Sequence, residues 1–165
     1  RQLPGNVTLR NRARFASYDK FYANVFPGGA LDTAGNVNLS AYNNATDRTN
    51  WFNQTDVVAT VATGAVRHVL LGGVELGRQD TDNRRETGYF GTNNATSYRV
   101  SAAAPTVTVP VRWAQSTSDA DNRTTARVGA LYVQDQVELG RFVQAIGGVR
   151  WDRFSTFLHN NRNGQ

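Results

Sequence analysis

Apolar and polar residues alternate along much of the chain, and the alternation is clearest over residues 130–152. Two such runs meet there at a predicted tight turn over residues 138–141. On the second run, one face carries Val143, Ala145, Gly147, Val149 and Trp151, and the other carries Gln144, Ile146, Gly148, Arg150 and Asp152. A period of two residues predicts β-strands whose two faces meet different surroundings. An apolar face toward lipid and a polar face toward a lumen are typical of a transmembrane barrel wall.

The same pattern predicts six strands, at residues 7–16, 21–27, 50–62, 68–79, 125–138 and 142–156. Short turns are expected at residues 17–20, 63–67 and 138–141, and long polar loops at residues 28–48 and 80–123. Short turns that alternate with long loops are typical of outer-membrane barrels, whose periplasmic turns are short and whose extracellular loops are longer. A soluble β-sandwich instead has turn signals every 8–12 residues or so.

Counting by twos along these strands assigns each side chain to an outward, lipid-facing side or an inward, lumen-facing side. The outward residues include Val7, Leu9, Ala13, Phe15, Val57, Ala59, Val61, Leu70, Val74 and Leu76. The charged residues predicted to face the lumen are Arg10, Arg12, Arg14, Glu75, Arg150 and Asp152. Carboxylates and arginines at such positions usually form structural ion pairs, so we predict that the protein is not an enzyme. Trp51 and Trp151 are expected at the outer edge of the apolar band; the alternative is two unrelated core tryptophans.

Composition narrows the choice of function. The 165 residues carry a net charge of +5, nearly all of it from arginines spread along the chain, with Lys20 the only lysine. A basic surface for nucleic acid would gather these charges on one face. There is no cysteine, and His68 and His159 lie far apart, so we predict no disulfide and no metal site. We expect His68 to be a rim residue hydrogen-bonded to the neighbouring turn.

Two groups of motifs carry a family resemblance. Residues 53–56 (NQTD) lead to Thr63-Gly64 and then to RHVLLGGVE at residues 67–75. The second group is YVQDQ at residues 132–136 and GGVRWD at residues 147–152. These motifs and the spacing between them strongly resemble consecutive barrel hairpins of TonB-dependent ferric-siderophore receptors.

The resemblance implies an all-β fold, an antiparallel transmembrane β-barrel of 22 strands of which about six are present here. It implies that residues 1–165 are an internal piece of the barrel domain, without the plug domain that fills such barrels. It also implies a bacterial outer-membrane protein that takes up ferric siderophores, with the TonB complex acting through the plug, and with no cofactor. The motifs are shared by receptors for hydroxamate, catecholate and mixed siderophores.

The second predicted loop contains aromatic residues and arginines that suit a large anionic iron chelate, namely Tyr89, Phe90, Tyr98, Arg99, Arg112 and Trp113. Arginine attracts the negative charge, and aromatic rings stack or make cation–π contacts. The alternative is that these side chains pack the loop against itself or against the barrel rim. For the whole protein, the alternatives are a passive porin-like barrel and a soluble domain such as a β-sandwich adhesin.

Overall fold

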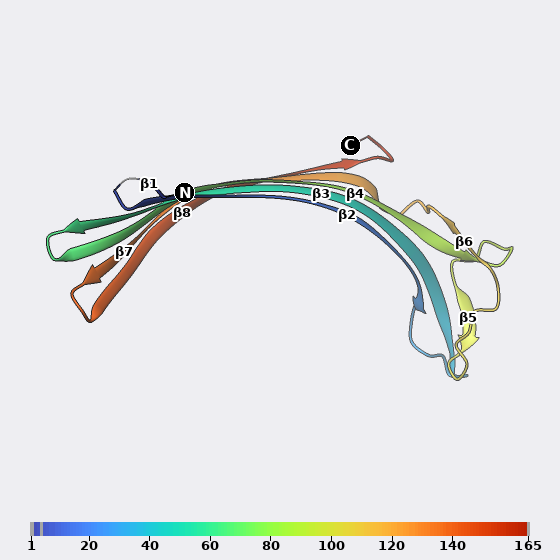
Figure 1. The fold of residues 1–165 in the computed structure, drawn as a ribbon. Coiled ribbons are helices and arrows are strands. Elements are labelled where there is room, and N and C mark those ends of the chain that lie inside the picture. Colours follow the sequence, from blue (N-terminus) through green and yellow to red (C-terminus); the bar gives the residue numbers. More distant parts are fainter. Residues whose placement is uncertain (1, 4, 165) are drawn as a thin grey trace. The chain divides into compact units, whose positions relative to one another are not determined.

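The computed structural model describes residues 2–3 and 5–164, and its regular elements are all strands (Figure 1). The strands are β1 (Gln2–Leu3), β2 (Val7–Pro27), β3 (Asn36–Thr63), β4 (Val66–Phe90), β5 (Tyr98–Ser101), β6 (Val111–Ala114), β7 (Asp121–Leu139) and β8 (Val143–Asn160). Within the described residues, no helix is long and apolar enough to span a membrane.

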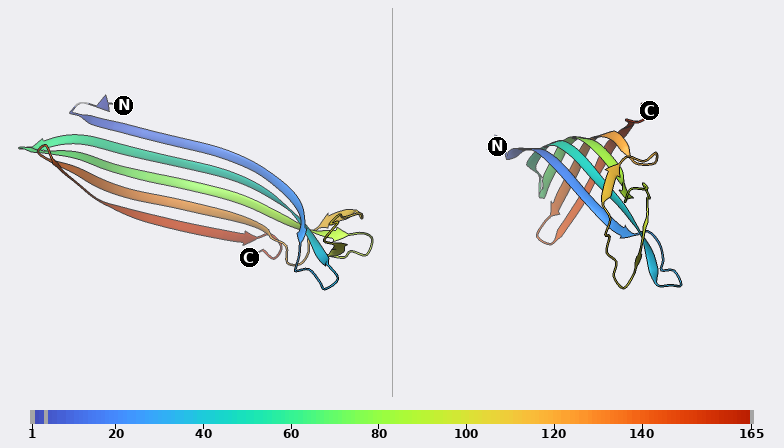
Figure 2. Two further views of the ribbon diagram at one scale, coloured as in Figure 1. Left: turned by 90° about the horizontal axis from the view of Figure 1, so that it is seen from below. Right: turned by 90° about the vertical axis from the view of Figure 1, so that its right-hand side faces the viewer.

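All the strands belong to one sheet, in the order β1-β2-β3-β4-β7-β8, with β5 paired to β3 and β6 paired to β4. The five long strands lie side by side in this order (Figure 2). Tight turns join β3 to β4 and β7 to β8, so each of these pairs is an antiparallel hairpin. Gly64 and Gly140 have φ values of 66° in these turns, a conformation that glycine adopts without steric cost. The predicted all-β antiparallel sheet is confirmed.

The strands are longer than the sequence pattern predicted, and one predicted turn is wrong. Residues 17–20 continue β2, because this segment has no glycine or proline to stop it and its hydrogen-bonded neighbour β3 continues alongside. The predicted loop over residues 28–48 is reduced to residues 28–35, where the Asp32 carboxylate accepts hydrogen bonds from the backbone N–H groups of Ala34 and Asn36. The predicted loop over residues 80–123 is also wrong in part, since β4 extends to Phe90 and the segment contains β5 and β6.

The chain divides into two compact units. The first comprises the described residues of Arg1–Ser17, Thr49–Asp80 and Thr124–Phe157, and contains both tight turns. Many large apolar side chains are exposed here, and most of them lie where outward-facing residues were predicted: Phe15, Val57, Val61, Leu70, Leu76, Leu131, Val133, Val143, Val149 and Trp151. Val149 is 72% exposed, which would be unfavourable in water and suits a face covered by lipid.

The second unit comprises the described residues of Tyr18–Arg48, Thr81–Arg123 and Leu158–Gln165. Its small apolar core joins Val37 and Leu39 of β3 to Val100 of β5, with Tyr98 and Val107 packed against them. The core forms because β5 pairs with residues 36–39 and brings its own apolar side chains to the same face. Part of the segment between β4 and β7 therefore belongs to the sheet, with β5 paired to β3 and β6 paired to β4.

Candidate functional site

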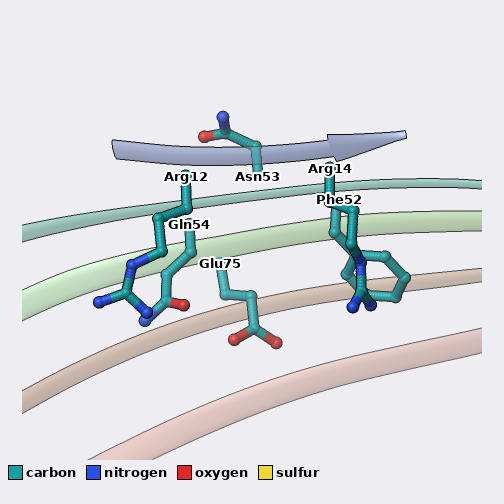
Figure 3. A pocket seen from close by; sticks show the side chains of 6 residues that line it. All are labelled: Arg12, Arg14, Phe52, Asn53, Gln54 and Glu75. Carbon is teal, nitrogen blue, oxygen red and sulfur yellow. The ribbon is translucent and has the colours of Figure 1, made fainter. Parts of the chain in front are cut away.

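A polar surface lies on one face of the sheet in the first unit. Arg12 and Arg14 of β2, Gln54 of β3 and Glu75 of β4 project to the same side, together with Phe52 (Figure 3). Asn53 projects to the opposite side, as strand alternation requires. The structure thus brings Arg12, Arg14 and Glu75 to one face of the sheet. That this face lines a lumen stays a prediction.

Two glycines of β4 allow aromatic rings to lie across this polar surface. A Cβ atom at Gly73 would lie 2.3 Å from the Tyr132 ring, and one at Gly77 would lie 2.4 Å from the Phe52 ring. The Tyr132 ring lies across β4 at Gly73, and the Tyr132 hydroxyl donates a hydrogen bond to Asp56 of β3. Asp56 is buried and also accepts a hydrogen bond from Gln54 Nε2 at 3.2 Å. The buried carboxylate therefore links β3 to β7 across β4, which lies between them.

Arg150 of β8 connects the other predicted charges of this surface. Its Nη2 lies 3.3 Å from Glu75 Oε1 and 2.8 Å from Asp152 Oδ1, and its guanidinium lies 5.4 Å from the Tyr132 ring centroid. The contacts with the two carboxylates are ion pairs of the kind that the sequence predicted. Arg10 is exposed, two positions before Arg12 on the same strand.

The second unit holds an aromatic cluster around Arg85 that sequence reasoning missed. The Arg85 guanidinium lies 4.0 Å from the Tyr42 ring centroid, and Tyr22 and Phe26 meet the same ring edge-on at 5.7 and 5.6 Å. Arg85 Nε is 3.5 Å from the carboxylate of Asp119, which is buried in the loop before β7. Tyr42 and Arg85 both fall in segments predicted to be loops, and no local pattern links two residues 43 positions apart.

The predicted ligand-binding residues are strand residues, and they divide between the two faces of the sheet. β6 pairs with β4 in the register Tyr89↔Arg112 and Gly88↔Trp113. Arg112 and Tyr89 therefore share one face, where the guanidinium lies 4.9 Å from the ring centroid and Arg112 also donates to Asn94 Oδ1 at 2.9 Å. Trp113 points to the opposite face and lies against the position a Cβ would take at Gly88.

The other three predicted ligand-binding residues have partners within the protein. Phe90 is 2% exposed and stacks on Tyr98, with ring centroids 5.7 Å apart. Arg99 is exposed but forms an ion pair with Asp32. Of the six residues, Arg112 and Tyr89 are thus the pair that combines a cation with a ring away from the core of this unit.

Two loop carboxylates are held in their charged form. The hydrogen bond from the Asn36 backbone, together with the Arg99 guanidinium, lowers the pKa of Asp32 below its usual value. Burial alone would raise the pKa of Asp119, but hydrogen bonds from Ser116 and Thr87 outweigh it and lower the pKa. Both carboxylates therefore remain ionised at neutral pH and fix the loops that contain them.

His68 has the hydrogen bond that its position predicted. Its Nε2 lies 3.0 Å from Thr63 Oγ1, next to the β3–β4 turn, and its Nδ1 lies 2.8 Å from Asp135 Oδ2. No group of three or more His, Cys, Asp or Glu side chains among the described residues is arranged to hold a metal ion. The histidine thus links two neighbouring hairpins.

A single sheet of long strands with an exposed apolar face and a polar face defines a membrane β-barrel wall. The family model for the TonB dependent receptor-like β-barrel matches residues 2–165, and the chain belongs to this family. It is 28% identical over 161 residues to the catecholate siderophore receptor Fiu of Escherichia coli O6:H1 (strain CFT073), covering 92% of this chain and 20% of that protein. The Fiu protein of Escherichia coli strain UTI89 is 27% identical over the same length, with the same coverage.

The fold has a counterpart among solved structures. The siderophore receptor PiuA from Acinetobacter baumannii matches with a TM-score of 0.76 at 19% sequence identity, over 96% of this chain and 24% of that one. The chain spans about one fifth of the length of the curated relatives it matches. Family membership and the single sheet exclude the soluble β-sandwich alternative.

Proposed function

We propose that this chain is part of the wall of a bacterial outer-membrane receptor that binds ferric siderophores and takes them up in a TonB-dependent manner. The family of the chain and the names of its relatives support this proposal. Binding and transport are its whole role, without catalysis and without a resident cofactor; the ferric siderophore is the cargo. In the complete receptor, a plug domain inside the barrel would connect the bound cargo to the TonB complex.

The observation that carries the proposal is the pairing of arginines with aromatic rings on one face of the second unit. Arg85 lies over Tyr42 at 4.0 Å, and Arg112 lies over Tyr89 at 4.9 Å. Arg85 and Tyr89 share a face of β4 because they are separated by an even number of residues. A ferric siderophore is a large anionic chelate, and the catecholate class also presents aromatic rings. Guanidinium groups supply fixed positive charge, and the rings supply flat contact area.

The two arginines contribute differently. Arg85 is neutralised in part by Asp119, so it chiefly orders the aromatic cluster. Arg112 is exposed and donates a hydrogen bond to the neutral side chain of Asn94, and no salt bridge among the described residues involves it, which leaves its charge for a ligand. We therefore assign the main electrostatic contact to Arg112, with Tyr89 as the ring beside it.

Binding of an iron-loaded catecholate siderophore to the full-length receptor in detergent tests this proposal. Arg112→Ala should weaken binding by about 1 kcal/mol or more, roughly fivefold, as expected for a contact that contributes strongly. His68→Ala is the control, since His68 lies beside a short turn of the first unit. Unchanged affinity in Arg112→Ala would remove this residue from the site. Weaker binding in the His68 variant alone would reverse the assignment of which end faces outward.

A further inference from the structure

We propose that the hydroxyl oxygens of Tyr22 and Tyr42 bind the ferric iron of the cargo directly, as phenolates, when the chelate leaves two coordination positions to water. The proposal rests on the proposed function, because the iron arrives in its chelate, and the metal is part of the cargo. Tyr22 of β2 and Tyr42 of β3 lie on neighbouring strands of the second unit. They are called the tyrosine pair below.

The phenol groups of the tyrosine pair meet edge to face. Their ring centroids are 5.7 Å apart, and the ring planes are at 81°. The Tyr42 hydroxyl oxygen accepts hydrogen bonds from the Tyr22 hydroxyl and from the side chain of Asn24. Two hydroxyl oxygens that share a hydrogen bond are about 2.7–2.8 Å apart. Neighbouring oxygen ligands of a small hard cation have nearly the same spacing, because each lies about 2.0–2.1 Å from the metal in an octahedron.

The tyrosine pair lies on the face proposed to receive the cargo. Tyr42 lies under the guanidinium of Arg85, which shares a face of β4 with Tyr89. Tyr22 is 37% exposed. Neither tyrosine belongs to the small apolar core of this unit, which joins β3 to β5. A chelate bound on this face can therefore reach the phenol oxygens without unfolding the core.

Two cations next to the tyrosine pair favour ionised phenols. The Arg85 guanidinium lies 4.0 Å from the Tyr42 ring centroid, and Lys20 Nζ lies 5.2 Å from that of Tyr22. The hydrogen bond from Tyr22, together with the charge of Arg85, lowers the pKa of Tyr42 below its usual value. Within the described part of the chain, no salt bridge involves Lys20, so its charge is available to offset that of a phenolate.

Ferric iron supplies the remaining driving force for ionisation. It is a hard cation, and tyrosine phenolate is one of the ligands that hold iron in haem proteins. A chelate with four oxygen donors leaves two of the six octahedral positions to water. In the proposed step two iron–water bonds break, two iron–phenolate bonds form, and the two phenol protons pass to solvent, while the iron stays ferric. A chelate with six oxygen donors has no free position and makes only the ring and charge contacts.

The test uses the full-length receptor in detergent and two iron-loaded synthetic probes, a bis-catecholate with four oxygen donors and a tris-catecholate with six. Resonance Raman spectra detect iron-bound tyrosine, and growth on ring-deuterated tyrosine shifts only the bands that belong to tyrosine. We expect iron–tyrosinate bands with the bis-catecholate and none with the tris-catecholate. The variant Tyr22→Phe/Tyr42→Phe keeps both rings and should abolish the bands.

Affinity separates metal binding from packing. Tyr42→Phe keeps the ring under Arg85 and removes one phenolate, so it should weaken bis-catecholate binding at least about tenfold more than tris-catecholate binding. The matched control is Tyr18→Phe, which removes the hydroxyl of an exposed tyrosine four residues before Tyr22 on the same strand. It should not change the ratio of the two affinities.

Several results would overturn the proposal. The first is the absence of iron–tyrosinate bands from wild-type receptor that has bound the bis-catecholate, and the second is their persistence in Tyr22→Phe/Tyr42→Phe. An equal loss for both probes in Tyr42→Phe would assign its hydroxyl to packing, and a selective loss in Tyr18→Phe would place the iron elsewhere. Failure of the proposed function is distinguishable, because wild-type receptor would then bind neither probe.

Discussion

At the scale of single residues, the glycines of β4 decide how its polar face is built. Gly73 and Gly77 leave bare backbone on either side of Glu75, and the rings of Tyr132 and Phe52 fill those positions from neighbouring strands. A glycine inside a strand normally weakens it, and a ring from the next strand compensates by covering the exposed backbone. The sequence GGVELG thus encodes two positions for aromatic rings around one carboxylate.

Gly73→Ala should destabilise the folded barrel, whereas Gly72→Ala should not. A Cβ atom at Gly73 would meet the Tyr132 ring, which cannot move without losing its hydrogen bond to Asp56, while a Cβ at Gly72 meets nothing within 4 Å. We expect a loss of about 1–3 kcal/mol in the free energy of unfolding for Gly73→Ala, the usual cost of overpacking. Urea-induced unfolding of the full-length protein in lipid vesicles measures both variants. Equal midpoints would show that Tyr132 is not held in place.

Strand alternation predicts the direction of single side chains well, but not their partners. The shared face of Arg12, Arg14 and Glu75 follows from counting by twos. The contact between Arg85 and Tyr42 depends on the register between β3 and β4, which begins at a turn about twenty residues away along the chain. Arg112 and Trp113 were predicted together as ligand-binding residues of a loop. The structure places both in β6, and neighbouring residues of a strand point to opposite faces, so the two side chains cannot both face one ligand.

At the scale of elements, the strands exceed what a bilayer requires. β2, β3 and β4 have 21, 28 and 25 residues, whereas about 9–11 residues cross a membrane. The additional length is polar, as at residues 43–50 of β3, and resembles loop sequence in its content of Asn, Asp and Thr. Hydrogen bonds to neighbouring strands satisfy the backbone of these segments, so a polar composition does not prevent a strand. For this reason, sequence reasoning made the strands too short.

The apolar face of β8 gives a direct test of which side meets lipid. Val149 is 72% exposed and lies on the face predicted to be outward, and Gln144 lies on the other face of the same strand. Val149→Arg should hinder insertion into lipid vesicles by about 2–4 kcal/mol, the cost of a cation near the bilayer midplane. Gln144→Arg should have little effect. Equal penalties in a refolding assay of the full-length protein would contradict the assignment of the two faces.

The segment before β7 depends on Asp119. Its carboxylate accepts hydrogen bonds from Thr87 N at 2.9 Å, Thr87 Oγ1 at 2.8 Å and Ser116 N at 2.8 Å. Because hydrogen bonds to a charged group typically contribute about 1.5–3 kcal/mol, Asp119→Ala should speed proteolysis of residues 91–120 by about tenfold or more. Asp82→Ala, which removes an exposed ion pair with Arg123, is the matched control and should have little effect.

The same carboxylate predicts a pH dependence. The pKa of Asp119 is lowered in the folded protein, so its stabilisation is fully present above the unfolded value of about 3.9. It is lost as the pH falls through the lower folded value. Limited proteolysis at decreasing pH should therefore show protection of residues 91–120 down to about pH 4 and its loss below that. Loss of protection near neutral pH would contradict the role assigned to Asp119.

At the scale of the whole molecule, the sheet has two ends. Among the described residues, β1 and β8 end the sheet order. An open edge leaves backbone groups without partners, which a bilayer does not tolerate, so the sheet fits a wall that further strands close. The chain matches the barrel family model and spans about one fifth of the length of its curated relatives, as expected for one segment of a barrel wall. The alternation of apolar and polar residues predicted a barrel wall, and the motifs predicted the family. Neither feature determines the number of strands in the closed barrel.

The most direct test of the account is uptake of radioactive iron by bacterial cells that produce the full-length protein. The cells should lack their own siderophore receptors and should be supplied with an iron-loaded catecholate siderophore, with and without a functional TonB. We predict that iron accumulates only when both the receptor and TonB are present, and that Arg112→Ala reduces the uptake at low siderophore concentration. Uptake that persists without TonB, or no uptake of any ferric siderophore, would contradict the account.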